Sequence, residues 1–122
     1  YDKLGEAAIE TGGFDVIVLD VPCSNTGVLA RRAEVRHRIT QKSITDLRQI
    51  QSEILNRAVL LLKGNGGLCY STCSIESAEN SEQTSRFLRE HKDFRLVTEK
   101  LTLPSADHPD HDGGYYAILT RN

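Results

Sequence analysis

Two cysteines stand directly after short apolar segments, where a chain often places reactive groups. Cys23 lies in the segment 20–27, which follows the apolar run 14–19, and Cys73 follows the run 68–71. A thiol in such a turn is exposed enough to react, and neighbouring amides and cations lower its pKa from about 8.5. Two strand ends of this kind can share one active site, so the pair indicates thiol chemistry.

The third cysteine and the polar loop near the C-terminus suggest roles other than thiol catalysis: core packing, metal binding or redox chemistry. Cys69 lies within the second apolar run, where a free cysteine usually packs as a small buried residue. A zinc site with His37 is an alternative, but the gap between Cys69 and Cys73 is wider than in most zinc knuckles. A redox role would require Cys23 and Cys73 to pair. The segment 107–112 fits no calcium template, so we interpret it as a lid or surface loop and assign no metal site.

Alternating strands and helices are predicted to position the two cysteine turns. We expect helices over residues 2–10, 43–62 and 77–91, and strands over residues 14–19, 68–71, 94–103 and 115–120. Gly64 is predicted to end the long helix, and Ser77 to cap the next one. The order implies an α/β fold with right-handed crossovers, a mainly parallel sheet and a final antiparallel pair of strands. Ligands bind at the carboxyl ends of such strands, where Asp20 and both turns lie.

The bulk properties describe one globular domain or a piece of one. The chain has 122 residues, 39% hydrophobic and 26% charged, with a formal net charge of -2. This net charge does not attract nucleic acid to the protein as a whole, so any nucleic-acid contact must come from a local group of basic residues. No segment resembles a membrane span or a signal peptide, and the odd number of cysteines indicates reduced thiols, so we expect a cytoplasmic protein. The chain begins at Tyr1 and contains no Met, which favours a piece of a longer protein.

Three segments carry motifs that occur together in a known family. They read DVPCSNTG at residues 20–27, TCS at residues 72–74 with Glu79 and Asn80 after it, and DGGYY at residues 112–116. In this order they resemble the motifs of the NOL1/NOP2/Sun RNA 5-methylcytosine methyltransferases, with the Sun/RsmB-like ribosomal RNA enzymes as the expected subgroup. Asn25 replaces the family's usual Gly, which is tolerable because Asn adopts left-handed backbone readily. Gly114 replaces an aromatic residue, so no stacking role is assigned there.

The resemblance implies distinct roles for the two cysteines. Cys73 is the implied nucleophile, which adds to C6 of cytosine so that C5 can accept a methyl group from S-adenosylmethionine. Cys23 is implied to assist release of the product. Asp20 is implied to contact the methyl donor or the cytosine edge, with Pro22 also in the substrate site, although Asp20 also suits an ordinary turn.

Other residues are candidates for contacts with RNA. Arg31 and Arg32 open the one basic concentration of the chain, and Arg36 and Arg38 complete it. They either hold RNA phosphates or form a solvated charged segment. The aromatic pair 115–116 either walls the pocket of a base that has left its helix or packs in the core. Ribosomal RNA is the expected partner, with transfer RNA as an alternative.

The family's Gly-rich loop, which binds the methyl donor, is expected before residue 14. We therefore expect residues 1–122 to be the C-terminal half of a Rossmann-like catalytic domain that alone transfers little methyl and binds the donor weakly. An unpaired sheet edge would also promote self-association of such a fragment. A second hypothesis is a catalytically silent RNA-binding or assembly module with the same half-Rossmann core.

Overall fold

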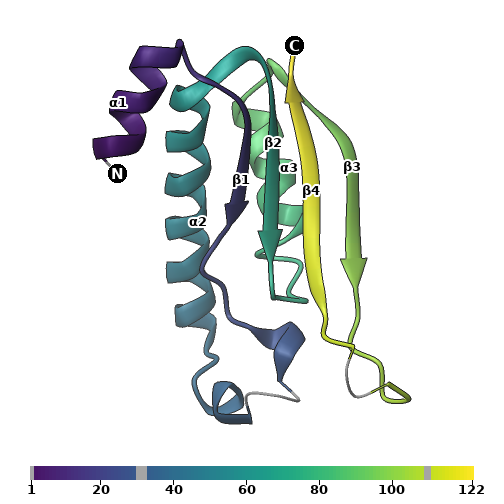
Figure 1. Cartoon of the computed structure of the whole chain (residues 1–122). Coiled ribbons are helices and arrows are strands. Elements are labelled where there is room, and N and C mark those ends of the chain that lie inside the picture. Colours follow the sequence, from purple (N-terminus) through teal and green to yellow (C-terminus); the bar gives the residue numbers. More distant parts are fainter. Residues whose placement is uncertain (1, 30–32, 109–110) are drawn as a thin grey trace.

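The computed structural model describes residues 2–29, 33–108 and 111–122, and it contains one sheet with helices packed against it (Figure 1). The helices are α1 (Asp2–Thr11), α2 (Gln41–Leu61) and α3 (Ser81–Glu90), and two short 3-10 helices are η1 (Thr26–Val28) and η2 (Ala33–His37). The strands are β1 (Phe14–Asp20), β2 (Leu62–Thr72), β3 (Phe94–Thr102) and β4 (Gly114–Arg121). The predicted order of helices and strands is confirmed.

The strands are arranged in the order β1-β2-β4-β3. β1 and β2 are parallel, and α2 makes the crossover between them. β3 and β4 form the antiparallel pair predicted for the last two strands. β4 also lies antiparallel to β2, because it enters the sheet between β2 and β3. The α/β class is confirmed, but the prediction of a mainly parallel sheet is wrong for the described strands, because only the β1–β2 pairing is parallel and both pairings of β4 are antiparallel. The carboxyl ends of β1 and β2 meet at one edge of the sheet.

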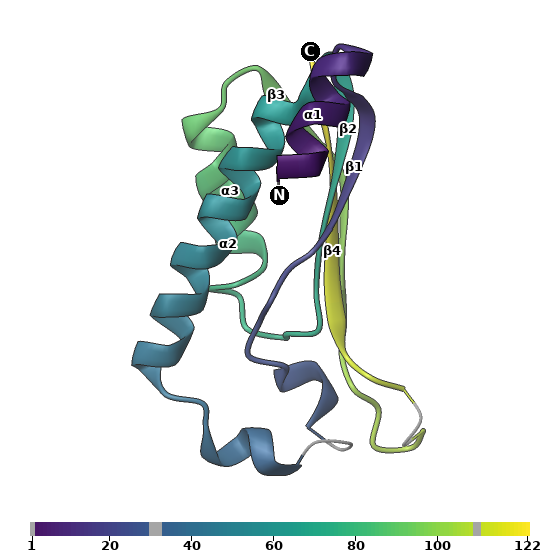
Figure 2. The same cartoon turned by 60° about the vertical axis from the view of Figure 1, so that its left-hand side comes forward.

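The helices α2 and α3 cover one face of the sheet, as Figure 2 shows. Burial alternates along β2, with Leu68, Tyr70 and Thr72 on the buried side. The other face of the sheet, which we call the open face, carries Val16 and Val18 with exposed fractions of 65% and 69%. Other large hydrophobic side chains on that face are Tyr116 and Ile118.

Cys69 is half-buried, and not fully buried as expected. It occupies a position on the open face, since it alternates with the buried Leu68 and Tyr70 and pairs with Val18. Neither α2 nor α3 covers that side of the sheet (Figure 2).

No helix among the described residues is long and apolar enough to cross a membrane.

The prediction that Gly64 ends the long helix is wrong. α2 ends at Leu61, and the next residue is already extended and starts β2. Gly64 lies inside β2, in an irregular stretch where Phe14 pairs with Leu62 but Val16 pairs with Gly67. The glycines here allow the chain to bulge beside β1, since a Cβ on Gly66 would lie 2.6 Å from the Leu62 side chain.

The prediction that Ser77 caps the following helix is also wrong. Residues 77–80 form a turn, and α3 begins at Ser81 with Asn80 as its N-cap. Asn80 makes no capping hydrogen bond with its side chain, because its amide is engaged with Thr72 and with the carbonyl oxygen of Ser74. The polar residues before α3 therefore organise the turn after Cys73.

Candidate active site at the carboxyl edge of β1 and β2

Three loops meet at Gly27, and they contain the three sequence motifs. The Gly27 N–H donates to the Cys73 carbonyl oxygen over 2.9 Å, and the Gly113 N–H donates to the Gly27 carbonyl oxygen over 2.7 Å. A Cβ on Gly27 would lie 2.3 Å from the oxygen of Gly113 and 2.7 Å from that of Cys73. Only glycine fits there, so the motif glycine is explained by close approach of backbones.

The two motif cysteines are in direct contact. The Cys73 N–H donates to the sulfur of Cys23 over 3.3 Å, and the Cys23 thiol lies 3.7 Å from the Asn25 amide oxygen that accepts from it. Both cysteines are free; Cys23 is half-buried and Cys73 is exposed. The expected meeting of the two turns is therefore confirmed, and the more accessible thiol belongs to Cys73.

The environment of Cys23 favours its neutral thiol, so the expectation of a lowered thiol pKa in this turn is wrong for Cys23. Burial is the largest influence and raises the pKa of Cys23, and the negative charge of Glu79 raises it further. Hydrogen bonds involving Asn25 and Cys73 lower the pKa of Cys23, but they do not cancel the increase. Cys23 is thus suited to hold a proton beside the exposed Cys73.

Asn25 supports the turn in the backbone conformation expected for it. Its φ and ψ angles are 60° and 26°, which is the left-handed region, and its side-chain amide donates to the Cys23 carbonyl oxygen over 3.2 Å. Asn is among the few non-glycine residues that adopt this conformation readily. The prediction that Asn25 tolerates the place of the family's Gly is confirmed.

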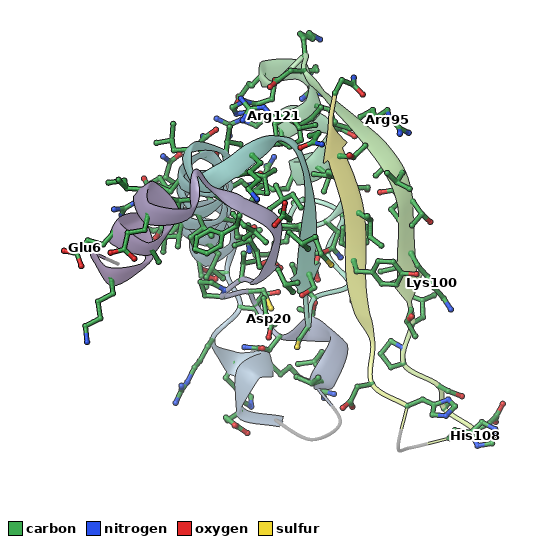
Figure 3. The ribbon with its side chains drawn as sticks, turned by 45° about the horizontal axis from the view of Figure 1, so that its top comes forward. Glu6, Asp20, Arg95, Lys100, His108 and Arg121 are labelled. Atoms are coloured by element: carbon green, nitrogen blue, oxygen red, sulfur yellow. The ribbon has the colours of Figure 1, made fainter. Side chains whose placement is uncertain are left out.

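Asp20 lies at the end of β1, beside the loops that carry η1 and η2 (Figure 3). Asp20 is exposed, and its carboxylate accepts a long hydrogen bond of 3.4 Å from the Ser71 hydroxyl. Pro22 is also exposed, and its carbonyl oxygen accepts from the side-chain amide of Gln51 over 3.0 Å. Asp20 therefore keeps acceptor capacity for an amine or hydroxyl of a ligand.

The other residues predicted to contact RNA fall into three groups: residues in the core, residues on the surface, and residues outside the part of the chain that the structure describes. Arg31 and Arg32 lie outside the described residues, whereas Arg36 and Arg38 are exposed in and just after η2. Tyr115 packs in the core, where its hydroxyl contacts Thr84 and Glu99, and Tyr116 lies on the open face.

The loop that carries His108 points away from Asp20 (Figure 3). The rings of His108 and His111 lie near each other there, tilted by 40° and with centroids 5.1 Å apart. Within the described parts of the chain, no three His, Cys, Asp or Glu side chains form a group that could hold a metal ion.

Glu79 is a site residue that sequence reasoning missed. From the sequence, Glu79 is expected to be a solvated residue in the first turn of a helix. In the structure Glu79 is fully buried, and its carboxylate accepts hydrogen bonds from both cysteine turns. The available signal was its place in the second motif, five residues after Ser74. Burial of an acidic residue is visible only in the fold.

The sequence is similar to those of known proteins over most of its length. A family model described as 16S rRNA methyltransferase RsmB/F matches residues 3–117. Ribosomal RNA small subunit methyltransferase B from Serratia proteamaculans is 42% identical over 113 residues, which are 88% of this chain and 26% of that protein. The protein of the same name from Photorhabdus laumondii is 41% identical over 119 residues, or 92% of this chain and 27% of that protein.

A solved structure shares the fold. The crystal structure of NSun6 from Pyrococcus horikoshii with SFG superposes with a TM-score of 0.71 and 25% sequence identity, covering 86% of this chain and 29% of that one. The chain thus spans about a quarter of the length of the curated relatives it matches.

Proposed function

Because the chain belongs to the RsmB/F family of 16S rRNA methyltransferases, we propose that it supplies the cysteine-bearing half of an active site that methylates cytosine at C5 in ribosomal RNA. The observation that carries this proposal is the contact between the Cys73 N–H and the Cys23 sulfur at the carboxyl edge of the sheet. Two thiols with different exposure suit a reaction that needs a nucleophile and a second proton-carrying group.

Cys73 is the proposed nucleophile. Its thiolate attacks C6 of the cytosine, a sulfur–carbon bond forms, and the C5–C6 double bond shifts its electrons so that C5 becomes nucleophilic. After C5 is methylated and loses its proton, the sulfur–carbon bond breaks, the double bond reforms and the Cys73 sulfur leaves with the electron pair. The exposure of Cys73 supports this role, because a base must approach its sulfur closely.

Cys23 is the proposed helper in release. Its raised pKa keeps a proton on the sulfur at neutral pH, and the contact of that sulfur with the Cys73 backbone N–H supports a proton transfer to the leaving thiolate. Transfer of the Cys23 proton to the departing Cys73 sulfur makes that sulfur a poorer nucleophile, and re-addition to C6 becomes slower. Loss of Cys23 therefore affects release more than attack.

S-adenosylmethionine, when bound, supplies the methyl group. Asp20 fits a contact with the donor or with the cytosine amine, because its exposed carboxylate keeps free acceptor positions at the end of β1. Pro22, beside it, is proposed to line the substrate site. Most contacts to the donor are expected from residues outside this chain, and residues 1–122 are proposed to be the C-terminal part of the catalytic domain.

RNA is the proposed partner, through its phosphates and the target base. Arg36 and Arg38 are exposed beyond the cysteine turns and are positioned to meet a phosphate backbone, with Arg31 and Arg32 proposed for the same role. A ribosomal RNA substrate places the activity in the cytoplasm. The alternative, a silent RNA-binding module, has no need of an accessible thiol at residue 73.

Trapping on RNA that contains 5-fluorocytosine tests the proposal in the full-length protein. The trapping mixture contains S-adenosylmethionine, because release is blocked only after C5 carries the methyl group. Fluorine at C5 then cannot leave as a proton does, so the covalent complex persists. We expect a complex stable to denaturation with the wild type, none with Cys73→Ala, and wild-type yield with Cys69→Ala, whose thiol lies within β2, before the turn that carries Cys73. Absence of a complex from the wild type, with RNA binding retained, would favour the silent module.

A further inference from the structure

Glu79 is a carboxylate that the fold buries completely. One oxygen accepts from the Ser24 N–H over 2.9 Å and from the side-chain amide of Gln51 over 3.1 Å. The other accepts from the Ser24 hydroxyl over 2.6 Å and from the Ser74 hydroxyl. Burying a charge is costly, and charge-assisted hydrogen bonds of this kind offset that cost.

The two serines bound to Glu79 are the residues that follow the two motif cysteines. Ser24 follows Cys23, and Ser74 follows Cys73. A single carboxylate oxygen therefore ties the turn after β1 to the turn after β2. Further hydrogen bonds join the same turns, because the Thr26 hydroxyl lies 3.2 Å from that of Ser74.

We propose that Glu79 is a positioning residue for both cysteines, which holds the Cys23 sulfur against the Cys73 amide by accepting hydrogen bonds from Ser24 and Ser74. This inference rests on the proposed function, because it assigns a purpose to the separation of the two thiols. Glu79 does not touch the reacting atoms. It acts through the backbone of the serine beside each cysteine.

A purely structural role fits the contacts less well. α3 starts two residues after Glu79 and has Asn80 as its N-cap, but the Glu79 carboxylate does not serve that helix end, which an acidic residue commonly supports. Among the described residues its hydrogen-bond donors belong to the Cys23 turn, the Cys73 turn and Gln51, which also binds the carbonyl oxygen of Pro22. The negative charge also raises the pKa of Cys23. Glu79 is thus coupled to the thiol electrostatically as well as through the turns.

The first test measures the reactivity of the Cys23 thiol against pH. The full-length wild type and the Glu79→Gln variant are treated with iodoacetamide over a range of pH, and alkylation of the Cys23 peptide is followed by mass spectrometry. We expect the midpoint for Cys23 to move to lower pH in the variant, because the nearby negative charge is removed. The matched control Glu82→Gln, which changes an exposed glutamate of α3, should leave the midpoint in place.

The second test measures the rate of covalent complex formation with 5-fluorocytosine RNA. We expect Glu79→Gln to form the complex about tenfold more slowly, the scale of loss when a reacting group is misplaced, with unchanged RNA affinity. Ser74→Ala keeps the charge and removes the hydroxyl that joins Glu79 to the Cys73 turn, together with its hydrogen bonds to Ser24, Thr26 and the Glu76 N–H. Ser74→Ala should slow complex formation to a similar extent, and the pH midpoint for alkylation of Cys23 should stay near that of the wild type. This variant also provides the test if Glu79→Gln does not fold.

The two tests separate this inference from the proposed function. Suppose that the wild type forms the complex and that Glu79→Gln, or a folded Ser74→Ala, forms it at the same rate. This result would overturn the positioning role of Glu79 and leave the proposed function intact. A wild type that forms no complex contradicts the function. The alkylation midpoint still decides on Glu79 in that case, since an unchanged midpoint in Glu79→Gln overturns the proposed coupling.

Discussion

The Cys73 amide donates a hydrogen bond to the Cys23 sulfur over 3.3 Å, although the two residues are fifty positions apart. This contact joins the ends of two parallel strands, and it depends on Gly27 and Glu79, which bring the two turns together. It gives the cysteines unequal environments, with Cys73 exposed and Cys23 half-buried. This inequality supports the proposed division into a nucleophile and a release helper.

Removal of the Cys23 thiol should trap the enzyme on its ordinary substrate. We predict that Cys23→Ala accumulates a covalent complex with unmodified RNA in the presence of the methyl donor, because attack by Cys73 proceeds and release is slowed. A denaturing gel detects the complex. Rapid turnover by this variant without any complex would exclude Cys23 from release.

Gly27→Ala should disrupt the meeting of the three loops. The new Cβ would lie within 2.3 Å of the Gly113 oxygen, so backbones must move apart, at a cost of about 1 to 3 kcal/mol of unfolding free energy. Denaturant unfolding of the full-length protein measures the change. Gly64→Ala is the matched control, because a Cβ there meets nothing within 4 Å, and equal stability of the two variants would argue against the close approach.

Alkaline pH should destabilise the fold through Tyr70. Burial is the main cause that raises the pKa of Tyr70, whose hydroxyl donates to the Glu79 carbonyl oxygen. The folded state therefore keeps a proton that the unfolded chain loses near pH ~10, so stability is full below that pH and falls above it.

The comparison of Tyr70→Phe with the wild type isolates this effect. The variant should be less stable by about 1 kcal/mol at neutral pH, since a buried hydrogen bond is lost, and its stability should fall less steeply in alkali. Denaturant midpoints between pH ~8 and ~11 give both slopes, a range that spans the ordinary tyrosine pKa. Parallel curves would mean that Tyr70 does not control the alkaline decline.

The open face should make the isolated 122-residue chain self-associate. Val18 is 69% exposed on β1, an edge strand of the described sheet, and such a surface favours pairing between copies. We predict that Val18→Lys lowers the apparent mass in sedimentation experiments. Leu60→Lys, which changes an exposed side chain of α2, should have little effect, and a monomeric wild-type chain would contradict the prediction.

The order of elements and the site edge could be predicted from sequence because each rests on local patterns. The apolar run before Asp20, the helical spacing before β2 and the turn residues around Asn25 each encode their own conformation. The joint placement of the Cys23 and Cys73 turns also follows, since parallel neighbouring strands end at one edge.

Features that depend on distant contacts could not be predicted in the same way. Gly64 looks like a helix stop, but pairing with β1 begins β2 at Leu62 and draws the glycines into a bulge. Glu79 looks like a surface residue at a helix start, but serines from two loops supply the donors that make its burial tolerable. Neither partner set is visible in the neighbouring sequence.

Peptide mapping of the trapped complex identifies the cysteine that attacks the base. The full-length protein is trapped on 5-fluorocytosine RNA, digested with protease and nuclease, and the modified peptide is identified by mass spectrometry. The proposed division of roles predicts that the nucleotide remnant is attached to Cys73, with Cys23 and Cys69 unmodified. A remnant on Cys23, or a methylated product formed with no cysteine adduct, would contradict it.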